Sequence, residues 1–415
     1  MSLNSVPSGE RIQIGFFGRR NAGKSSLVNA VTGQEMAVVD ATLGTTTDPV
    51  IKAMEILPLG PVVIIDTPGF DDEGRLGSLR VKKTKQILTR VDVAILVVDV
   101  TIGISECDKE LIDIFNERKI PYIIAWNKTD ILESIYLNNQ NKKPENDGMY
   151  SEIGKEDGHK EIRLSSVTHQ GIDELKELIG TLFKFKEDTP LLSDLIEEGD
   201  VIILVIPIDA SAPKGRVILP QQQVLREILD CNAMAFCVQP KELPDALLKM
   251  NNKVKMVITD SQAFVTVKDM VPENIYLTSF SILMARHKGI LKGAYRAVKA
   301  IDNLKDGDRV LISEGCTHHR QCEDIGTVKL PKLLRSYTGK KLVFEYTSGN
   351  TFADDIEGYD LVIHCGGCML GDTEVRSRLH ISEGAGIPMT NYGLAISYMR
   401  GILERSISVI PEDEL

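Results

Sequence analysis

The stretch "GRRNAGKSS", residues 18–26, decides how the first part of this 415-residue chain folds. It lies between a strand-like apolar run, "RIQIGFFG", and a helix-like run, "SSLVNAVTG". It fits the pattern G-x-x-x-x-G-K-[ST], with the fixed positions filled by Gly18, Gly23, Lys24 and Ser25. Glycines at this spacing let backbone N–H groups curl around phosphate oxygens, while the lysine meets the terminal phosphates and the serine hydroxyl suits Mg²⁺. The stretch therefore predicts a phosphate-binding loop at a helix N-terminus, with Ser26 as a further contact, in an α/β domain.

Two further stretches predict the rest of the phosphate site. In "VVIIDTPGF" a buried strand ends at Asp66, whose carboxylate can hold Mg²⁺ through water, and Gly69 can place its N–H near a γ-phosphate. "ATLGTTTDPV" falls after the first helix, where a switch loop belongs, and we expect the Thr46 hydroxyl to close on Mg²⁺. We therefore assign the groups acting at the terminal phosphate to Lys24, Thr46 and Gly69.

Two later stretches predict which base is bound. "YIIAWNKTD" is a strand that ends in Asn127, Lys128 and Asp130, at the spacing of a guanine reader in which the aspartate accepts two hydrogen bonds from the base edge. "IRLSSVTHQGIDEL" is similar to the last base-contact loop of such proteins, at Ser165 and Ser166, before a closing helix. Because these motifs follow the phosphate loop in the right order and on the right elements, they predict GTP with Mg²⁺ as the ligand.

Residues 10–185 resemble the translation-factor-like GTPases, a class that includes tRNA-modification and ribosome-assembly GTPases. Phe70 stands where Ras-type switches carry a water-orienting glutamine, so unassisted hydrolysis is expected to be slow. Asn21 in the phosphate loop and the segment "GTTTD" are similar to features of potassium-activated relatives, which implies a K⁺ ion near the β- and γ-phosphates. Thr47 replaces the arginine of those relatives, and the alternative that Asn21 only stabilises the loop turn stays open.

Composition narrows the class of protein. A formal net charge of −11 counts against a broad phosphate-neutralising surface, so nucleic acid is not expected as the main partner. The sequence contains no apolar run of 18 or more residues, so no membrane span is predicted. The N-terminus "MSLNSVPSGE" lacks the pattern of an export signal, and we expect a cytoplasmic protein. Seven cysteines do not form a disulfide scaffold in a chain of this length, and clustered cysteines then suggest metal or redox chemistry.

The remaining sequence predicts two smaller α/β domains. The polar segment 138–160 is interpreted as a surface insertion before the last strand of the GTPase domain. The expected division is a P-loop GTPase domain (1–185), an assembly domain (186–280) and a metal-binding domain (281–415). In the middle domain Cys231 and Cys237 flank an apolar run, and we expect buried, inert thiols for both.

The last domain gathers the metal-ligand types. The strand at Arg309–Ser313 leads into a loop with Cys316 and His318, and "YDLVIHCGGC" is a strand that runs into Cys365 and Cys368. Alternation of strands and helices predicts a parallel sheet, in which functional loops meet at the carboxyl ends of the strands. The three cysteines are therefore expected to converge, although nearly fifty residues separate the first from the other two.

Three thiolates with an uncertain fourth ligand fit an iron–sulfur cluster with an exchangeable iron better than a closed structural zinc site. The glycines between Cys365 and Cys368 leave N–H groups free to bind sulfur. His318 and His364 remain possible metal ligands. The residues expected to be ordinary loop, surface or structural groups are His319, His380, Cys322 and Cys107.

A GTPase followed by C-x-H and, further on, H-C-x-x-C resembles the HydF family of di-iron hydrogenase maturation GTPases over the whole chain. The resemblance implies a 4Fe-4S cluster on Cys316, Cys365 and Cys368 and a homodimer through the middle region. It further implies a scaffold that receives a di-iron precursor made with radical-SAM maturases and delivers it to apo di-iron hydrogenase. Two alternatives stay open, namely an RNA- or ribosome-associated GTPase with a zinc tail, and a redox sensor whose cluster gates GTP turnover.

Overall fold

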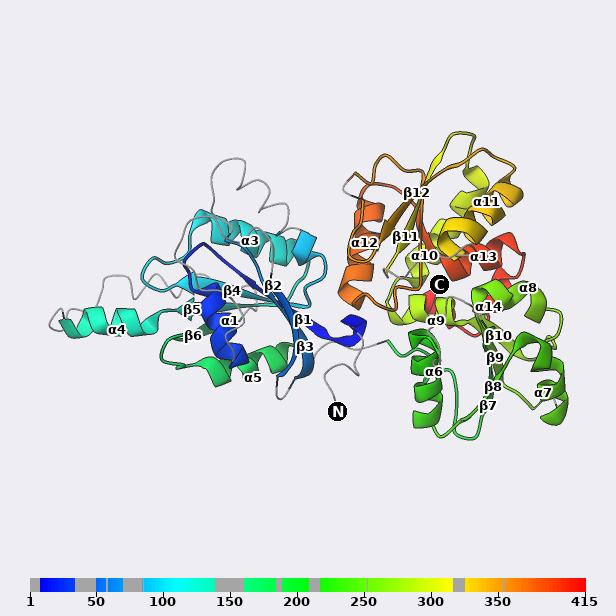
Figure 1. Ribbon diagram of the computed structural model, residues 1–415, viewed down its shortest axis with the longest axis horizontal. Helices are drawn as coiled ribbons and strands as arrows, with labels where there is room; N and C mark the ends of the chain where they lie inside the picture. Colours follow the sequence, from blue (N-terminus) through cyan, green and yellow to red (C-terminus); the bar gives the residue numbers. More distant parts are fainter. Residues whose placement is uncertain are drawn as a thin grey trace. The chain divides into compact units, whose positions relative to one another are not determined.

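The computed structural model of the chain describes residues 8–33, 50–56, 59–69, 84, 86–138, 160–183, 189–208, 217–251, 253–315, 325–353 and 355–415. These residues form two compact units, Met1–Glu187 and Asp188–Leu415 (Figure 1). The structure confirms the expected α/β class, with a nucleotide-binding type of sheet first and further parallel sheets after it. The finer division into three domains stays a prediction.

The first unit is built on a six-stranded sheet in the order β2-β3-β1-β4-β5-β6 among the described residues. All neighbouring strands are parallel except β2 and β3. The strands are β1 (Ile12–Phe17), β2 (Val50–Ile56), β3 (Gly60–Asp66), β4 (Val93–Asp99), β5 (Tyr122–Asn127) and β6 (Lys160–Arg163). The helices are α1 (Lys24–Thr32), α3 (Glu106–Glu117), α4 (Thr129–Asn138) and α5 (Ile172–Phe183), after the 3₁₀ turn Ser8–Glu10.

Two apolar layers enclose this sheet. The central strands β1, β4 and β5 are buried along their whole length, as expected of parallel strands covered on both faces. Helices α1 and α5 pack on one face, with Leu27 and Leu175 in the same cluster, and α3 packs on the other through Phe115. Figure 1 shows α3 on the opposite side of the sheet from α1 and α5. Because β1 runs parallel to its neighbours β3 and β4, the loop that follows it lies at the carboxyl edge of the sheet.

Strand β2 is an element that the sequence analysis did not identify. The second strand is Val50–Ile56, and it pairs antiparallel with β3. Only residues 57–59 separate the two strands, and a connection this short joins antiparallel neighbours. The pattern expected of a half-buried strand is weak here, because three consecutive residues of β2, Ile51, Lys52 and Ala53, are exposed and show no alternation.

In the described part of the second unit, two four-stranded parallel sheets have the same winding order, β10-β9-β7-β8 and β14-β13-β11-β12. The first is formed by β7 (Val201–Val205), α6 (Leu219–Asp230), β8 (Met234–Val238), α7 (Leu243–Lys249), β9 (Met256–Thr259), α8 (Phe264–Val267), β10 (Tyr276–Ser279) and α9 (Phe280–His287). After α10 (Leu291–Ala297) the second is formed by β11 (Arg309–Glu314), α11 (Leu330–Thr338), β12 (Val343–Ser348), β13 (Leu361–His364), α12 (Asp372–Gly384), β14 (Met389–Asn391), α13 (Tyr392–Met399) and α14 (Leu403–Ile407). Short 3₁₀ or π turns are Pro240–Glu242, Ser261–Ala263, Val298–Asn303, Ile325–Lys329 and Glu412–Glu414.

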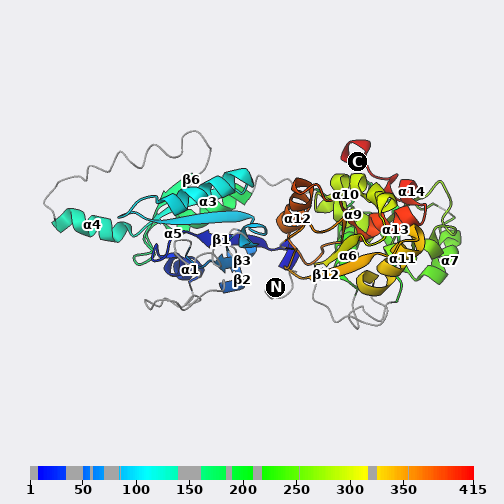
Figure 2. The same ribbon diagram turned by 90° about the horizontal axis from the view of Figure 1, so that it is seen from above.

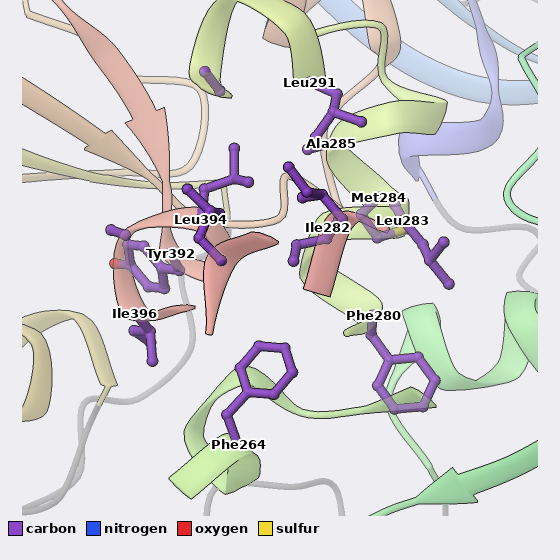
Figure 3. Close-up of a cluster of buried hydrophobic side chains, with 14 of the residues drawn as sticks. Phe264, Phe280, Ile282, Leu283, Met284, Ala285, Leu291, Tyr392, Leu394 and Ile396 are labelled. Carbon is purple, nitrogen blue, oxygen red and sulfur yellow. The ribbon is translucent and has the colours of Figure 1, made fainter. Parts of the chain in front are cut away.

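One continuous apolar core joins the two small sheets. Helices α9 and α13 each follow the last strand of their sheet and pack against one another. Figure 3 shows their side chains, Ile282 and Leu394 among them, gathered with Phe264 and Phe280. The start of α13 is tied to α9 by Asn391 Nδ2, which donates to the Ser281 carbonyl at 2.9 Å. Figure 2 shows the same helices from above.

Strand β8 lies at the edge of its sheet, and this position corrects one prediction. Cys237 is exposed, so the expectation that its thiol is buried is wrong, whereas Cys231 is half-buried. An edge strand keeps one side and part of one face open to water, which an apolar run alone does not reveal. The expectation of a surface His380 is confirmed, because its side chain is 77% exposed. Among the described helices, none has the length and apolar character needed to cross a membrane.

Candidate functional site

The phosphate loop follows β1 and ends in the first turn of α1. Lys24 is buried, and its Nζ donates to the carbonyl oxygens of Gly18 at 2.9 Å and Arg19 at 2.7 Å. Gly23 has a φ of 93°, and a Cβ there would lie 2.3 Å from Asn127 Nδ2. Only glycine therefore fits where the loop meets the base-reading strand. Ser26 lies in the first turn of the helix and is half-buried.

A hydroxyl and a carboxylate meet beneath this loop. Ser25 Oγ donates to Asp66 Oδ2 at 2.6 Å, and Asp66 Oδ1 is buried with no hydrogen-bond partner among the described residues. Burial raises the pKa of Asp66, while the Ser25 hydrogen bond and the Lys24 charge act in the opposite direction. A buried, unsatisfied carboxylate oxygen beside a serine hydroxyl fits Mg²⁺, which prefers oxygen ligands. The predicted partner Thr46 lies outside the described residues, as do Thr47 and Phe70.

Gly69, which is predicted to place its N–H near the γ-phosphate, lies close to the backbone of the phosphate loop. A Cβ at this position would be 2.9 Å from the Arg20 backbone nitrogen and 3.0 Å from its Cα, so the segment after β3 packs directly on the phosphate loop. Asn21 occupies the same loop with a φ of 61° and is exposed. Asparagine adopts this left-handed conformation more readily than most residues do.

The residues that the sequence predicts to read the base come together at the ends of β5 and β6. Asn127 is fully buried, donates from Nδ2 to the Ala22 carbonyl at 3.0 Å, and accepts from the Ser166 N–H at 3.0 Å. Ser165 Oγ donates to Asp130 Oδ1 at 2.6 Å, which orients the carboxylate and leaves Oδ2 for a donor on the base. The structure therefore brings together residues that are about 40 positions apart in the sequence.

Asp99 is a member of this site that the sequence prediction missed. It ends β4, and its carboxylate accepts from Lys128 Nζ at 2.6 Å and from the Thr101 N–H at 2.9 Å. Burial alone would raise the pKa of Asp99, but these hydrogen bonds outweigh it and hold the pKa below its ordinary value. The signal was available, because Asp99 follows a buried strand, "VAILVV", at the same sheet edge as the phosphate loop.

The second candidate site lies at the carboxyl edge of the β11–β14 sheet. Strands β11 and β13 are parallel neighbours, with Ser313 opposite His364. Just beyond their ends the Gly315 N–H donates to Cys365 Sγ at 3.0 Å, and the Gly367 N–H lies 3.4 Å from the same sulfur. This edge is the topological switch point of the sheet, since the chain leaves β11 in one direction and returns as β13 on the other side.

The chemistry of this loop fits a soft metal. Burial raises the pKa of the Cys365 thiol, and burial together with the neighbouring Cys365 raises that of Cys368 to about 11. Thiols in this environment become thiolates when a metal replaces the proton, and the N–H donors then stabilise the sulfur charge. No group of three metal-ligand residues occurs within the described ranges. Cys316 and His318 fall between Gly315 and Ile325, outside those ranges, as do His319 and Cys322.

His364 is held by protein groups on both sides of its ring. Arg378 Nη1 donates to His364 Nε2 at 3.1 Å, and His364 Nδ1 lies 2.7 Å from the Cys365 carbonyl oxygen, which makes Nδ1 the protonated nitrogen. Burial and the Arg378 charge lower the pKa of His364 to about 3, so the ring is neutral. Arg378 is itself paired with Glu374 at 2.7 Å. This arrangement positions the cysteine loop and leaves no ring nitrogen open to a metal.

Three family models match the chain. Residues 13–128 match a model described as 50S ribosome-binding GTPase, and the first unit is a P-loop GTPase domain. Residues 191–289 match the hydrogen maturase F dimerization domain, and residues 292–409 match the hydrogen maturase F tetramerization domain. The last two cover both small sheets of the second unit.

Curated relatives match mainly the GTPase part. The tRNA modification GTPase MnmE of Natranaerobius thermophilus is 30% identical over 174 residues, which cover 42% of this chain and 35% of the relative. GTPase Der of Kosmotoga olearia is 30% identical over 195 residues, covering 45% and 43%. This chain thus spans about a third to a half of the length of these relatives. Among solved structures, Era of Aquifex aeolicus bound to GDP and aluminium fluoride is 18% identical, with a TM-score of 0.32 over 58% of this chain and 98% of that one.

Proposed function

We propose a function that proceeds from one premise: this chain belongs to the hydrogen maturase F family of hydrogenase maturation GTPases. It hydrolyses GTP and binds a 4Fe-4S cluster on Cys316, Cys365 and Cys368. It serves as a scaffold that transfers a di-iron precursor to apo di-iron hydrogenase. The domains that match the family models are named for self-association, which supports a homodimer or a larger assembly as the working form.

The observation that carries the cluster proposal is the 3.0 Å hydrogen bond from the Gly315 N–H to Cys365 Sγ. Cys316 is the next residue after Gly315, and consecutive Cα atoms are about 3.8 Å apart. The chain therefore enters Cys316 from a point that already touches the Cys365 sulfur. Cys368 belongs to the same loop as Cys365, so the three proposed thiolates would come from segments that follow two neighbouring parallel strands. When bound, the cluster would supply an iron with an exchangeable position for the cargo.

The nucleotide site supports GTP hydrolysis controlled by Mg²⁺. Ser25 and Asp66 would hold the ion, Lys24 would neutralise the terminal phosphates, and the Gly69 N–H would meet the γ-phosphate, with the Thr46 hydroxyl closing the site. Asp130 would accept from the guanine edge. We propose that K⁺ binds beside Asn21 and takes part of the charge that develops between the β- and γ-phosphates. This step needs no glutamine at position 70.

Anaerobic reconstitution with iron and sulfide tests the cluster proposal. The wild-type chain is expected to bind about four irons and to absorb broadly near 400 nm, a region typical of iron–sulfide charge transfer. The variants Cys316→Ala, Cys365→Ala and Cys368→Ala are each expected to lose most of this absorbance. Cys237→Ala is the matched control, because this exposed thiol on β8 lies in the other small sheet. A colourless protein that binds one zinc would instead support the alternative of an RNA-associated GTPase with a structural metal.

The carrier role needs a separate test. Reconstituted chain is incubated with the di-iron precursor produced by radical-SAM maturases, separated from them, and mixed with apo di-iron hydrogenase. Hydrogen evolution should appear with the wild-type chain and fall at least tenfold with Cys365→Ala. Equal hydrogen evolution from both chains would contradict the scaffold role, and a cluster whose oxidation state changes GTP turnover without any transfer would support a redox sensor.

A further inference from the structure

Helix α9 ends at the cysteine loop and places a buried cation there. Lys288 caps the C-terminus of this helix, and its side chain is only 2% exposed. Its Nζ donates to the Leu370 carbonyl at 2.9 Å and to Asp372 Oδ1 at 2.8 Å. Leu370 is the second residue after Cys368, and Asp372 begins α12. One ammonium group therefore holds both the end of the cysteine loop and the start of the next helix.

The same face of α9 packs along the loop. Ser281, Met284 and Lys288 are spaced by three and four residues, which places them on one side of a helix. A Cβ added at Gly366, between the two cysteines, would lie 3.8 Å from Met284 Cβ and 3.9 Å from Ser281 Oγ. The segment 191–289, which contains α9, thus forms one wall of a loop that belongs to segment 292–409.

The charge of Lys288 reaches the cysteine sulfur. Burial is the largest influence on the pKa of Cys368 and raises it, and the positive charge of Lys288 acts against this rise. Asp372 is 16% exposed and lies 2.8 Å from Lys288 Nζ, so the two residues place charges of opposite sign beside the loop. Removing Lys288 would take a positive charge from the neighbourhood of the loop, and removing Asp372 would take a negative one, in a region of low effective dielectric constant where charges interact strongly.

We propose that Lys288 is a positioning residue that anchors the Cys365–Cys368 loop to α9 and balances the negative charge of a cluster bound there. The inference rests on the proposed function, because it requires a cluster on these cysteines. Three thiolates around a 4Fe-4S core give a negative site, and reduction adds one more negative charge. A neighbouring cation stabilises the reduced form, so the reduction potential depends on net charge close to the cluster.

A charge series tests this assignment on the reconstituted full-length chain, by potentiometric titration followed with electron paramagnetic resonance. Lys288→Met is expected to lower the equilibrium constant for reduction about tenfold, a shift of about 59 mV to more negative potential for a one-electron couple. Asp372→Asn is expected to shift the potential in the opposite direction. The double variant, Lys288→Met with Asp372→Asn, should fall between them, and Lys288→Arg should stay near the wild-type value.

The opposite signs separate the electrostatic role from a purely structural one. Loss of packing would shift both single variants in the same direction, and that result would overturn the proposal. Lys255→Met is the matched control, since Lys255 is paired with Asp200 at 2.8 Å and precedes β9 of the other small sheet. It removes the same charge and should leave the potential unchanged.

If the Lys288→Met variant folds but binds no iron, its reduction potential cannot be measured, and a second measurement tests the proposal instead. In the metal-free protein, amide hydrogen exchange in the loop of residues 365–370 should be at least threefold faster in this variant than in the wild type, because the loop has lost its anchor. Equal rates would overturn the proposal. A wild-type chain that forms no cluster would instead refute the proposed function, whereas a wild-type cluster with a flat charge series would refute only this inference.

Discussion

The Lys128 ammonium nitrogen lies 2.6 Å from Asp99 Oδ2, so the end of β4 orients a side chain that belongs to the base-reading motif on β5. Both side chains are largely sheltered, with 26% and 10% of their surfaces exposed. A pair in this environment keeps its geometry better than a surface ion pair, whose contribution is commonly close to zero. Asp99 therefore fixes the direction of the Lys128 side chain within the predicted guanine-reading motif.

Replacing Asp99 should weaken nucleotide binding. We expect Asp99→Asn to raise the Kd for GDP about tenfold, or about 1.4 kcal/mol, because Lys128 loses its charged partner and its fixed orientation. Titration with a fluorescent GDP analogue measures this effect. Asp173→Asn is the control, since its ion pair with Lys176 involves a carboxylate that is 91% exposed. An unchanged Kd for Asp99→Asn would contradict the positioning role.

A methyl group in the phosphate loop should abolish binding. Gly23→Ala would bring a Cβ to 2.3 Å from Asn127 Nδ2 at a φ of 93°, so both the loop and the base-reading strand must move. We expect no measurable GTP binding by calorimetry. Gly33→Ala provides the comparison, because it has a φ of 64° but nothing within 4 Å of the added atom. That variant should lose only about 1 kcal/mol of stability and still bind GTP.

Potassium should accelerate GTP hydrolysis if Asn21 holds the ion. Turnover in KCl is expected to exceed turnover in NaCl at least fivefold for the wild-type chain, because K⁺ would supply positive charge between the β- and γ-phosphates. Asn21→Ala should reduce turnover in KCl to the rate that the wild type shows in NaCl, while leaving GDP affinity within a factor of three. Equal rates in the two salts would show that Asn21 only shapes the exposed turn.

His364 should be dispensable for cluster assembly. Its two ring nitrogens are occupied by Arg378 and by the Cys365 carbonyl, so we expect His364→Asn to bind the same amount of iron and sulfide as the wild type. The variant should unfold at a lower temperature, because the buried guanidinium of Arg378 loses one of its acceptors. Loss of one iron per chain with unchanged stability would mean that the ring is a ligand after all.

Acid should loosen the attachment between the start and the end of the second unit. Arg286 is 1% exposed and binds both Asp194, with Nη1 to Oδ1 at 2.8 Å, and Glu414. The hydrogen bond from Arg286 lowers the pKa of Asp194 below its ordinary value of 3.8. A lowered folded-state pKa contributes stability above the unfolded-state pKa, and this contribution is lost as the pH falls through the folded value.

Asp194→Asn should therefore flatten the acid limb of the stability profile. Urea unfolding at pH values between 3 and 7 would show a smaller decrease in midpoint toward acid for the variant than for the wild type. Asp200→Asn, which alters a partly exposed pair with Lys255, serves as the comparison. Parallel profiles for wild type and Asp194→Asn would contradict the contribution of this ion pair.

The sequence predicted those parts of the site that depend on local spacing. Gly23, Lys24 and Ser25 are neighbours on one loop, so a short pattern suffices to place them. The guanine reader and the cysteine loop could be predicted for the same reason, because each directly follows a recognisable buried strand. Parallel pairing of β11 and β13 then followed from the alternation of strands and helices.

Contacts between distant residues could not be predicted in this way. Asp99 and Lys128 are 29 positions apart, and Lys288 and Asp372 are 84 apart, so no short pattern links the partners. The sequence also left His364 open as a metal ligand. The Nε2 atom of His364 is bound by Arg378, which belongs to another element, α12, so the sequence around His364 does not reveal this contact. Tertiary packing also buries three cationic side chains, although arginine and lysine are usually exposed. These are Arg286, Lys288 and Arg378.

The unbroken apolar core of residues 188–415 has a consequence for how this part of the chain melts. The two family models meet between residues 289 and 292, yet α9 and α13 bury their side chains in each other across that boundary. A fragment that ends between residues 289 and 292 would expose the apolar side chains that the two sheets share. We expect such a fragment to aggregate instead of folding. Calorimetry of the whole chain should accordingly resolve one cooperative transition for the GTPase unit and only one more for everything after it.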